Sequence, residues 1–329
     1  MVGEFDLIDE IRTRAAGAGV LRSPRLALPS GDDCAVTVPG GATATSTDAI
    51  VDGVHFRLDW TTPEQVGGKA VAVALSDLAA MGAQAGEIYV QLGLPAEMDD
   101  ADVLTLADGA IAASAEAGAA IAGGDIVASP VLFVAVTVVG HAARPESFVT
   151  RGGAEPGDLV VLSGELGGAA AGLRLFESPE LGTSLNEVVA DALRGRQVSP
   201  RPRLELGAIL AAAGAGAMID VSDGLAGDAC HLADASGVVL EIDLGRVPVQ
   251  AGVAEVAAAI AIETAELLLG GEDYELLATI SSEMEADAIA AAAAADATLT
   301  VIGRVSAGAG IKLLGARPLR GGRGFRHRR

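Results

Sequence analysis

Short acidic strings, each beside glycine or a hydroxyl side chain, recur along this chain. They are Gly31-Asp32-Asp33, Ser46-Thr47-Asp48, Ser76-Asp77, Gly123-Gly124-Asp125 and Asp220-Val221-Ser222-Asp223-Gly224. Carboxylate and hydroxyl oxygens at turns and strand ends are hard ligands that suit several Mg²⁺ ions, which could in turn hold the phosphates of a nucleotide. A single Asp beside Gly is more often a turn former or a helix N-cap, and Asp223 is the best N-cap candidate. Five such strings in one chain favour a metal-dependent phosphoryl-transfer enzyme.

The common phosphate-binding loops are missing from the sequence. Lys69 follows Gly68, but the glycine spacing of GxxxxGK[ST] is absent and Ala70 stands where the metal-binding hydroxyl would be. No GxGxxG string follows an expected strand. Since Lys312 is the only other lysine, a triphosphate would have to be neutralised by cations held on aspartates and by a few arginines. Arg151 could grip a phosphate through two parallel hydrogen bonds, and a surface ion pair is its alternative role.

Composition narrows the class of protein. A length of 329 residues favours two domains. The formal net charge of −22 argues against nucleic acid and membranes as partners. No apolar stretch reaches the roughly 18 residues of a membrane-spanning helix, and the acidic start lacks the positive region of a secretory signal. With only two cysteines, the sequence predicts a cytoplasmic protein.

The hydrophobic pattern predicts a mixture of strands and helices in both halves. In the first half, helical periodicity covers residues 5–14, 63–81 and 99–117, and strand patterns cover 42–46, 87–94 and 131–140. In the second half, strands are expected at 159–163, 238–242 and 274–280, with another that ends at Asp220. The pattern therefore predicts a mixed α/β fold with domains at 1–145 and 146–329.

Seven strings in chain order resemble the thiamine-monophosphate kinase family. They are GDDCAV (31–36), STDAIVDGVHF (46–56), KAVAVALSDLAAMGA (69–83), GGD (123–125), RGGAEPGD (151–158), DVSDG (220–224) and GGEDYEL (270–276). That family is similar to aminoimidazole ribonucleotide synthetase and selenophosphate synthetase, and the resemblance covers essentially the whole chain. It implies ATP-dependent phosphorylation of thiamine monophosphate to thiamine diphosphate, a step of thiamine diphosphate biosynthesis.

The resemblance also implies a role for individual residues. The Mg²⁺ ligands would be Asp33, Ser46, Thr47, Asp48, Asp77, Asp125, Asp220 and Asp223. The ATP contacts would be Gly124, Asp125, Arg151 and Ser222, and the thiamine-phosphate contacts would be His55, Glu272 and Phe325. No side chain is expected to act as a general base, because the acceptor is a phosphate oxygen that is already ionised. Positioning and charge neutralisation would then carry catalysis.

By the same resemblance, domain 1–145 would bind ATP and Mg²⁺ and pair its sheet with a second copy, so that a homodimer encloses a barrel. Domain 146–329 would cover the cleft and complete the active site. Two alternatives stay open. One is a ligase or cyclase of the same superfamily that activates an amide or carbonyl oxygen, against which the Gly270–Tyr274 string argues. The other is a non-catalytic cation- or nucleotide-binding protein whose acidic strings are caps and turns.

Overall fold

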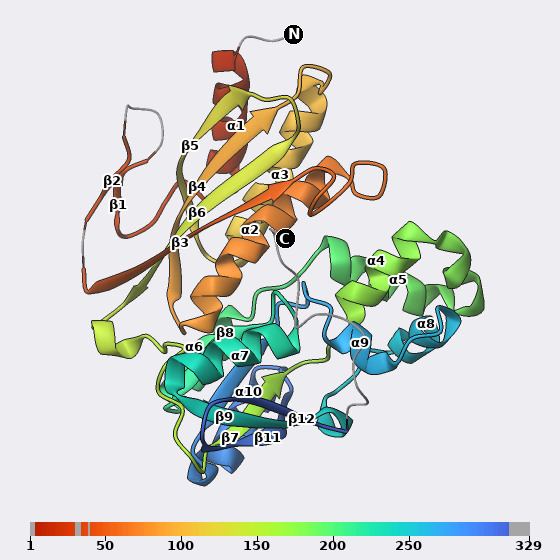
Figure 1. Ribbon diagram of the computed structural model, residues 1–329. Coiled ribbons are helices and arrows are strands. Elements are labelled where there is room, and N and C mark those ends of the chain that lie inside the picture. The colour runs from red at the N-terminus through yellow and green to blue at the C-terminus, as the bar shows by residue number, and fades with distance from the viewer. Residues whose placement is uncertain (1–3, 30–33, 39, 316–329) are drawn as a thin grey trace. The chain divides into compact units, whose positions relative to one another are not determined.

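The computed structural model describes residues 4–29, 34–38 and 40–315, and the chain divides into two compact units (Figure 1). The first unit combines Met1–Leu78 with Ala83–Pro145, and the second combines Ala79–Gly82 with Glu146–Arg329. Each unit has a sheet of its own and several helices. The predicted two-domain mixed α/β fold is therefore confirmed.

A four-stranded sheet forms the centre of the first unit, with the strand order β3-β6-β4-β5. Strands β3 (Ala42–Val51) and β4 (Gln84–Leu94) pair antiparallel with β6 (Phe133–Ala142), and β5 (Ala120–Ala128) runs parallel to β4. A small antiparallel ribbon joins β1 (Leu26–Leu28) and β2 (Val36–Thr37). Helices α1 (Glu4–Gly17), α2 (Pro63–Ala80) and α3 (Asp100–Glu116) lie together on one side of the sheet (Figure 1).

Strand β3 is longer than the sequence predicted. The expected strand ended at residue 46, whereas the strand continues to Val51. The residues that follow include Thr, Ile and Val, whose branched side chains favour extended backbone. The Ser46-Thr47-Asp48 string therefore lies inside the strand and not at its end.

Two glycines allow α2 and α3 to pack closely against each other. A Cβ atom on Gly67 would lie 1.9 Å from the carbonyl oxygen of Leu106, and one on Gly109 would lie 1.9 Å from that of Glu64. Both distances are far shorter than any real contact, so each helix needs glycine at the crossing. This crossing holds α2, which carries Asp77, in its place beside the sheet.

A six-stranded sheet forms the centre of the second unit, with the order β12-β9-β11-β7-β10-β8. Its strands are β7 (Leu159–Ser163), β8 (Ala217–Asp220), β9 (Val238–Asp243), β10 (Leu276–Ile280), β11 (Leu299–Ala307) and β12 (Gly310–Leu314). All neighbouring pairs are antiparallel except β12 with β9.

Helices cover both faces of this sheet. One face packs Val160, Ile219 and Leu240 against Leu225 and Leu232 of α7 (Leu225–Ser236). The other face packs against α6 (Leu204–Ala212) and α10 (Glu285–Ala294). A separate apolar cluster joins α4 (Gly168–Glu177), α5 (Glu187–Val198), α8 (Val253–Ala259) and α9 (Thr264–Leu268).

Short 3₁₀ turns occur at Pro145–Ser147, where the chain passes from the first unit to the second, and within the second unit at Pro179–Ser184, Leu244–Arg246 and Ser282–Met284. Among the helices of the described ranges, none has the length and apolar character needed to span a bilayer.

Candidate functional site

Ser46 and Asp48 lie on the same face of β3, and Thr47 lies on the opposite face. Side chains alternate along a strand, and the Oγ of Ser46 donates a hydrogen bond to Oδ2 of Asp77 on α2. The hydroxyl of Thr47 instead meets Thr137 of β6 on the exposed face, with 3.1 Å between the two Oγ1 atoms. Any oxygen that Thr47 supplied to a metal beside Asp48 would therefore have to be its main-chain carbonyl.

Gly124 and Asp125 lie on the other edge strand of the same sheet. The register places Asp48 in one cross-strand row with Val136, Val90 and Gly124. Gly124 is required there, because a Cβ atom would lie 2.1 Å from the carbonyl oxygen of Val90. Asp125 is exposed, and its Oδ1 accepts the N–H of Ile126 at 2.9 Å.

The width of the sheet decides whether Asp48 and Asp125 can share an ion. Three strand spacings separate the two edge strands, which amounts to about 14 Å. Mg²⁺ binds oxygen at about 2.1 Å, so one ion cannot reach both carboxylates. If both aspartates are ligands, they hold different ions, as the expectation of several ions requires.

His55 is fixed by two hydrogen bonds in the turn after β3. Its Nδ1 accepts the N–H of Val51 at 3.1 Å, so the neutral ring carries its proton on Nε2. Its carbonyl oxygen accepts a hydrogen bond from Nζ of Lys69 at 3.0 Å. Lys69 is only 2% exposed, which is unusual for lysine. The turn therefore presents the imidazole in a defined orientation.

In the second unit, the Asp220–Gly224 segment connects β8 to α7. The helix begins at Leu225 and its N-cap is Gly224, whose φ is 101°. The N-cap role considered for Asp223 is therefore wrong. A Cβ atom at position 224 would lie 2.2 Å from the carbonyl oxygen of Leu269, so only glycine fits the start of this helix. Asp223 is therefore not explained as the N-cap residue of α7.

Asp228, in the first turn of α7, is a residue that the sequence reasoning missed. Its Oδ2 accepts the N–H of Asp223 at 3.1 Å, and the residue is 2% exposed. Burial, together with the negative charges of Asp220 and Asp223, raises the pKa of Asp228 to about 8. A cation near these carboxylates would relieve the repulsion. The sequence did offer one indication of this residue, since Asp228 lies four residues after Gly224.

Glu272 is held against Ser222 by the main chain. The N–H of Glu272 donates to the carbonyl oxygen of Ser222 at 2.8 Å, and that of Tyr274 donates to the carbonyl oxygen of Val221 at 2.9 Å. Glu272 has a φ of 63°, which costs a non-glycine residue on the order of 1 kcal/mol. The predicted nucleotide contact and the predicted acceptor contact are thus brought together within this unit.

Two buried carboxylates anchor the segment that carries Glu272. Asp273 accepts the N–H groups of Gly167 at 2.8 Å and Ala169 at 3.1 Å. Burial nevertheless raises the pKa of Asp273 to about 6. Glu275 accepts hydrogen bonds from Arg196 and Arg203, with 2.9 Å between its Oε2 and Nε of Arg203. Because the side chains of Asp273 and Glu275 are both held by hydrogen bonds, the backbone at the adjacent Glu272 has little freedom.

Arg151 is exposed at the beginning of the second unit. Its carbonyl oxygen accepts the hydroxyl of Ser236 at 3.0 Å. Among the described residues, no carboxylate forms an ion pair with its guanidinium. The surface ion pair considered as its alternative role is therefore not seen in that part of the chain. Asp33 and Phe325 lie outside the described residues.

The oxygen ligands described above suit Mg²⁺ chemically, but they do not form a complete coordination site by themselves. Carboxylate and hydroxyl oxygens, which Mg²⁺ prefers, are the groups on β3, α2 and the β8–α7 connection. Within residues 4–29, 34–38 and 40–315, no three His, Cys, Asp or Glu side chains gather closely enough to hold an ion. Further oxygens, such as those of a nucleotide phosphate, would have to complete the coordination.

Comparison with known proteins connects these residues to a family. The family models described as AIR synthase related protein match residues 31–142 with the N-terminal domain and 155–315 with the C-terminal domain. Thiamine-monophosphate kinase of Mycobacterium tuberculosis is 41% identical over 84% of this chain and 80% of its own length. That of Methanospirillum hungatei is 38% identical over 86% of this chain and 89% of its own length.

Solved structures agree with the sequence relatives. Thiamine-monophosphate kinase from Stenotrophomonas maltophilia superposes with a TM-score of 0.81 and 34% identity, covering 95% of this chain and 96% of that one. AaThiL complexed with AMPPCP and TMP gives a TM-score of 0.78 and 32% identity, covering 99% and 97%. The chain therefore belongs to the thiamine-monophosphate kinase family of AIR synthase related proteins.

Proposed function

We propose that this protein transfers the γ-phosphoryl group of ATP to the phosphate of thiamine monophosphate, giving thiamine diphosphate and ADP. The extent of the family match carries the proposal. The two family models together span every candidate residue except Arg151 and Phe325. A relative with 32% identity has been solved with AMPPCP and TMP, an ATP analogue and the proposed acceptor.

The residues divide into nucleotide and acceptor groups. Mg²⁺ would be held by six aspartates, with oxygens added by the Ser46 hydroxyl and the Thr47 carbonyl; the aspartates are Asp33, Asp48, Asp77, Asp125, Asp220 and Asp223. Bound Mg²⁺ would neutralise the phosphate charge. Gly124, Ser222 and Arg151 would contact ATP, and the exposed guanidinium of Arg151 suits bidentate binding of a phosphate. His55, Glu272 and Phe325 would contact the acceptor.

We also propose a homodimer in the cytoplasm. Thr43, Thr45, Thr47 and Ala49 form an exposed row along β3, on the face away from Asp77. This row gives a second copy a surface on which sheets could pair. Cys34 and Cys230 are not joined, which suits a reducing compartment.

A direct assay tests the reaction. Purified protein is incubated with ATP, Mg²⁺ and thiamine monophosphate, and thiamine diphosphate and ADP are both quantified by chromatography. We expect one ADP for each thiamine diphosphate, with neither product formed when EDTA is present. ADP that accumulates at the same rate without thiamine monophosphate would reject the proposed acceptor and favour another ATP-dependent reaction.

The metal assignment predicts a loss of activity in Asp48→Asn. An amide keeps the size of the side chain and one oxygen but removes the charge that a hard cation requires. We expect turnover to fall by about a hundredfold or more, the scale on which removing one electrostatic contact acts. Asp234→Asn, which makes the same charge change at an exposed site on α7, should retain wild-type turnover. Equal rates in both variants at saturating Mg²⁺ would reject Asp48 as a ligand.

A further inference from the structure

Gln197 is a buried amide that touches the carboxylate of Glu272. It lies in the last turn of α5 and is 7% exposed. Its Nε2 donates a hydrogen bond to Oε2 of Glu272, a residue 75 positions away in the chain. A buried polar side chain is costly unless it is hydrogen-bonded, and a bond to a charged group is stronger than one between neutral groups. This contact is thus a stabilised, specific arrangement.

The backbone around Glu272 leaves only the side chain to be oriented. Gly271 has a φ of 135°, and a Cβ atom there would lie 2.4 Å from the carbonyl oxygen of Ser222. On the other side of Glu272, the carboxylate of Asp273 accepts two main-chain N–H groups at the beginning of α4. Glu272 itself is held by its N–H bond to Ser222. The main chain leaves the direction of the carboxylate open, and the hydrogen bond from Gln197 to its Oε2 restricts that direction.

We propose that Gln197 is a positioning residue for acceptor recognition, which fixes the plane of the Glu272 carboxylate through the hydrogen bond from its Nε2. The proposal rests on the proposed function, in which Glu272 receives hydrogen bonds from the amino-bearing ring of the acceptor. A carboxylate held in one plane discriminates between a ring that offers N–H donors and one that lacks them, because a carboxylate that a bound ring covers without a hydrogen bond is costly. Gln197 therefore determines specificity for aminopyrimidine-bearing phosphates and leaves ATP binding alone.

Steady-state kinetics of Gln197→Met and Gln197→Glu test the proposal. Methionine fills a similar volume without a donor, whereas glutamate places a second negative charge against Glu272. We expect the KM for thiamine monophosphate to rise about tenfold in the methionine variant, which corresponds to about 1.4 kcal/mol. The rise should be larger in the glutamate variant. The KM for ATP should stay within a factor of two in both, since Gln197 is not among the residues proposed to contact ATP.

A double-mutant cycle separates positioning from a general structural role. If Gln197 acts through Glu272, the double variant Gln197→Met with Glu272→Gln should have the same acceptor KM as Glu272→Gln alone. Additive effects, or equal increases in the KM for ATP and for acceptor, would overturn the proposal. A wild-type enzyme that makes no thiamine diphosphate would instead refute the proposed function. A Glu272→Gln enzyme with normal acceptor KM would overturn the role of Glu272, and that of Gln197 with it.

Discussion

At the scale of single residues, two buried carboxylates in the second unit are stabilised in different ways. Glu275 is fully buried but has two guanidinium partners in Arg196 and Arg203. Asp273 is 1% exposed and relies mainly on two main-chain N–H groups. Hydrogen bonds from neutral donors compensate a buried charge less well than cations do. The cost of burial therefore appears in the pKa of Asp273, which is raised from 3.8 to about 6.

This raised pKa predicts a pH dependence of stability. Between pH 4 and about 6, the folded state keeps the Asp273 proton that the unfolded state has lost. The free energy of unfolding should therefore fall as pH rises through this range, by on the order of 2–3 kcal/mol from this group. Asp273→Asn cannot ionise, so it should lose this component of the slope while keeping one acceptor oxygen. Urea unfolding at pH 4.5, 6.0 and 7.5, with Asp234→Asn as a control, measures it. Parallel curves for wild type and Asp273→Asn would contradict the assignment.

At the scale of elements, the α2–α3 crossing depends on glycine on both helices. Gly109→Ala places a Cβ atom 1.9 Å from the carbonyl oxygen of Glu64, and main chain cannot move aside as a flexible side chain can. The helices would have to separate, which should cost about 1–3 kcal/mol or more. Gly195→Ala on α5 has nothing within 4 Å and should stabilise the protein by up to about 1 kcal/mol. Thermal unfolding should show shifts of opposite sign, and equal shifts would contradict the close-packing argument.

The elements also show what sequence patterns could predict. Helix α2 begins at Pro63 as expected, because proline suits the first helical position and the apolar spacing is strong. Two further features follow from local rules and could have been predicted. Side-chain alternation along β3 places Thr47 on the face opposite Ser46, and the conformational freedom of glycine favours Gly224 as the N-cap of α7. The contact from Gln197 to Glu272 could not be found, because it depends on tertiary packing across 75 positions. The position of Asp228 four residues after Gly224 could be read from the sequence, but its burial could not, since burial is a property of the folded unit.

At the scale of the whole molecule, positive charge is scarce and unevenly placed. The chain carries 44 acidic side chains against 22 lysines and arginines, and both Arg196 and Arg203 are committed to the buried Glu275. Most of the surface thus repels anions. A nucleotide would be bound only where cations or an exposed guanidinium offset the repulsion. This is why the proposed chemistry concentrates on the acidic strings and Arg151.

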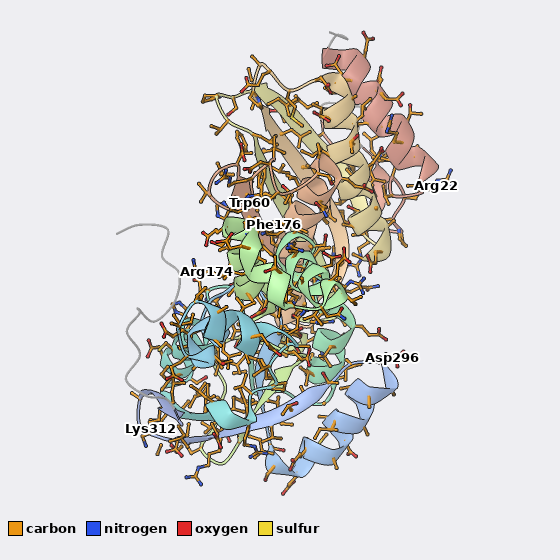
Figure 2. The ribbon with its side chains drawn as sticks, turned by 90° about the vertical axis from the view of Figure 1, so that its right-hand side faces the viewer. Arg22, Trp60, Arg174, Phe176, Asp296 and Lys312 are labelled. Atoms are coloured by element: carbon orange, nitrogen blue, oxygen red, sulfur yellow. The ribbon has the colours of Figure 1, made fainter. Side chains whose placement is uncertain are left out.

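The burial of Lys69 has a practical consequence for protein chemistry, because an amine must meet the reagent before it can be acylated. The two lysines differ sharply: Lys69 is 2% exposed, whereas the side chain of Lys312 on β12 is 60% exposed, 3.0 Å from Glu241 and on the outside of its unit (Figure 2). An N-hydroxysuccinimide ester should therefore modify Lys312, apart from the α-amino group, in the native protein. Lys69 should react only after the first unit opens. Peptide mapping of acylated Lys69 across a urea series would then report unfolding of that unit alone, and labelling of Lys69 without denaturant would show that the His55 turn opens in the native state.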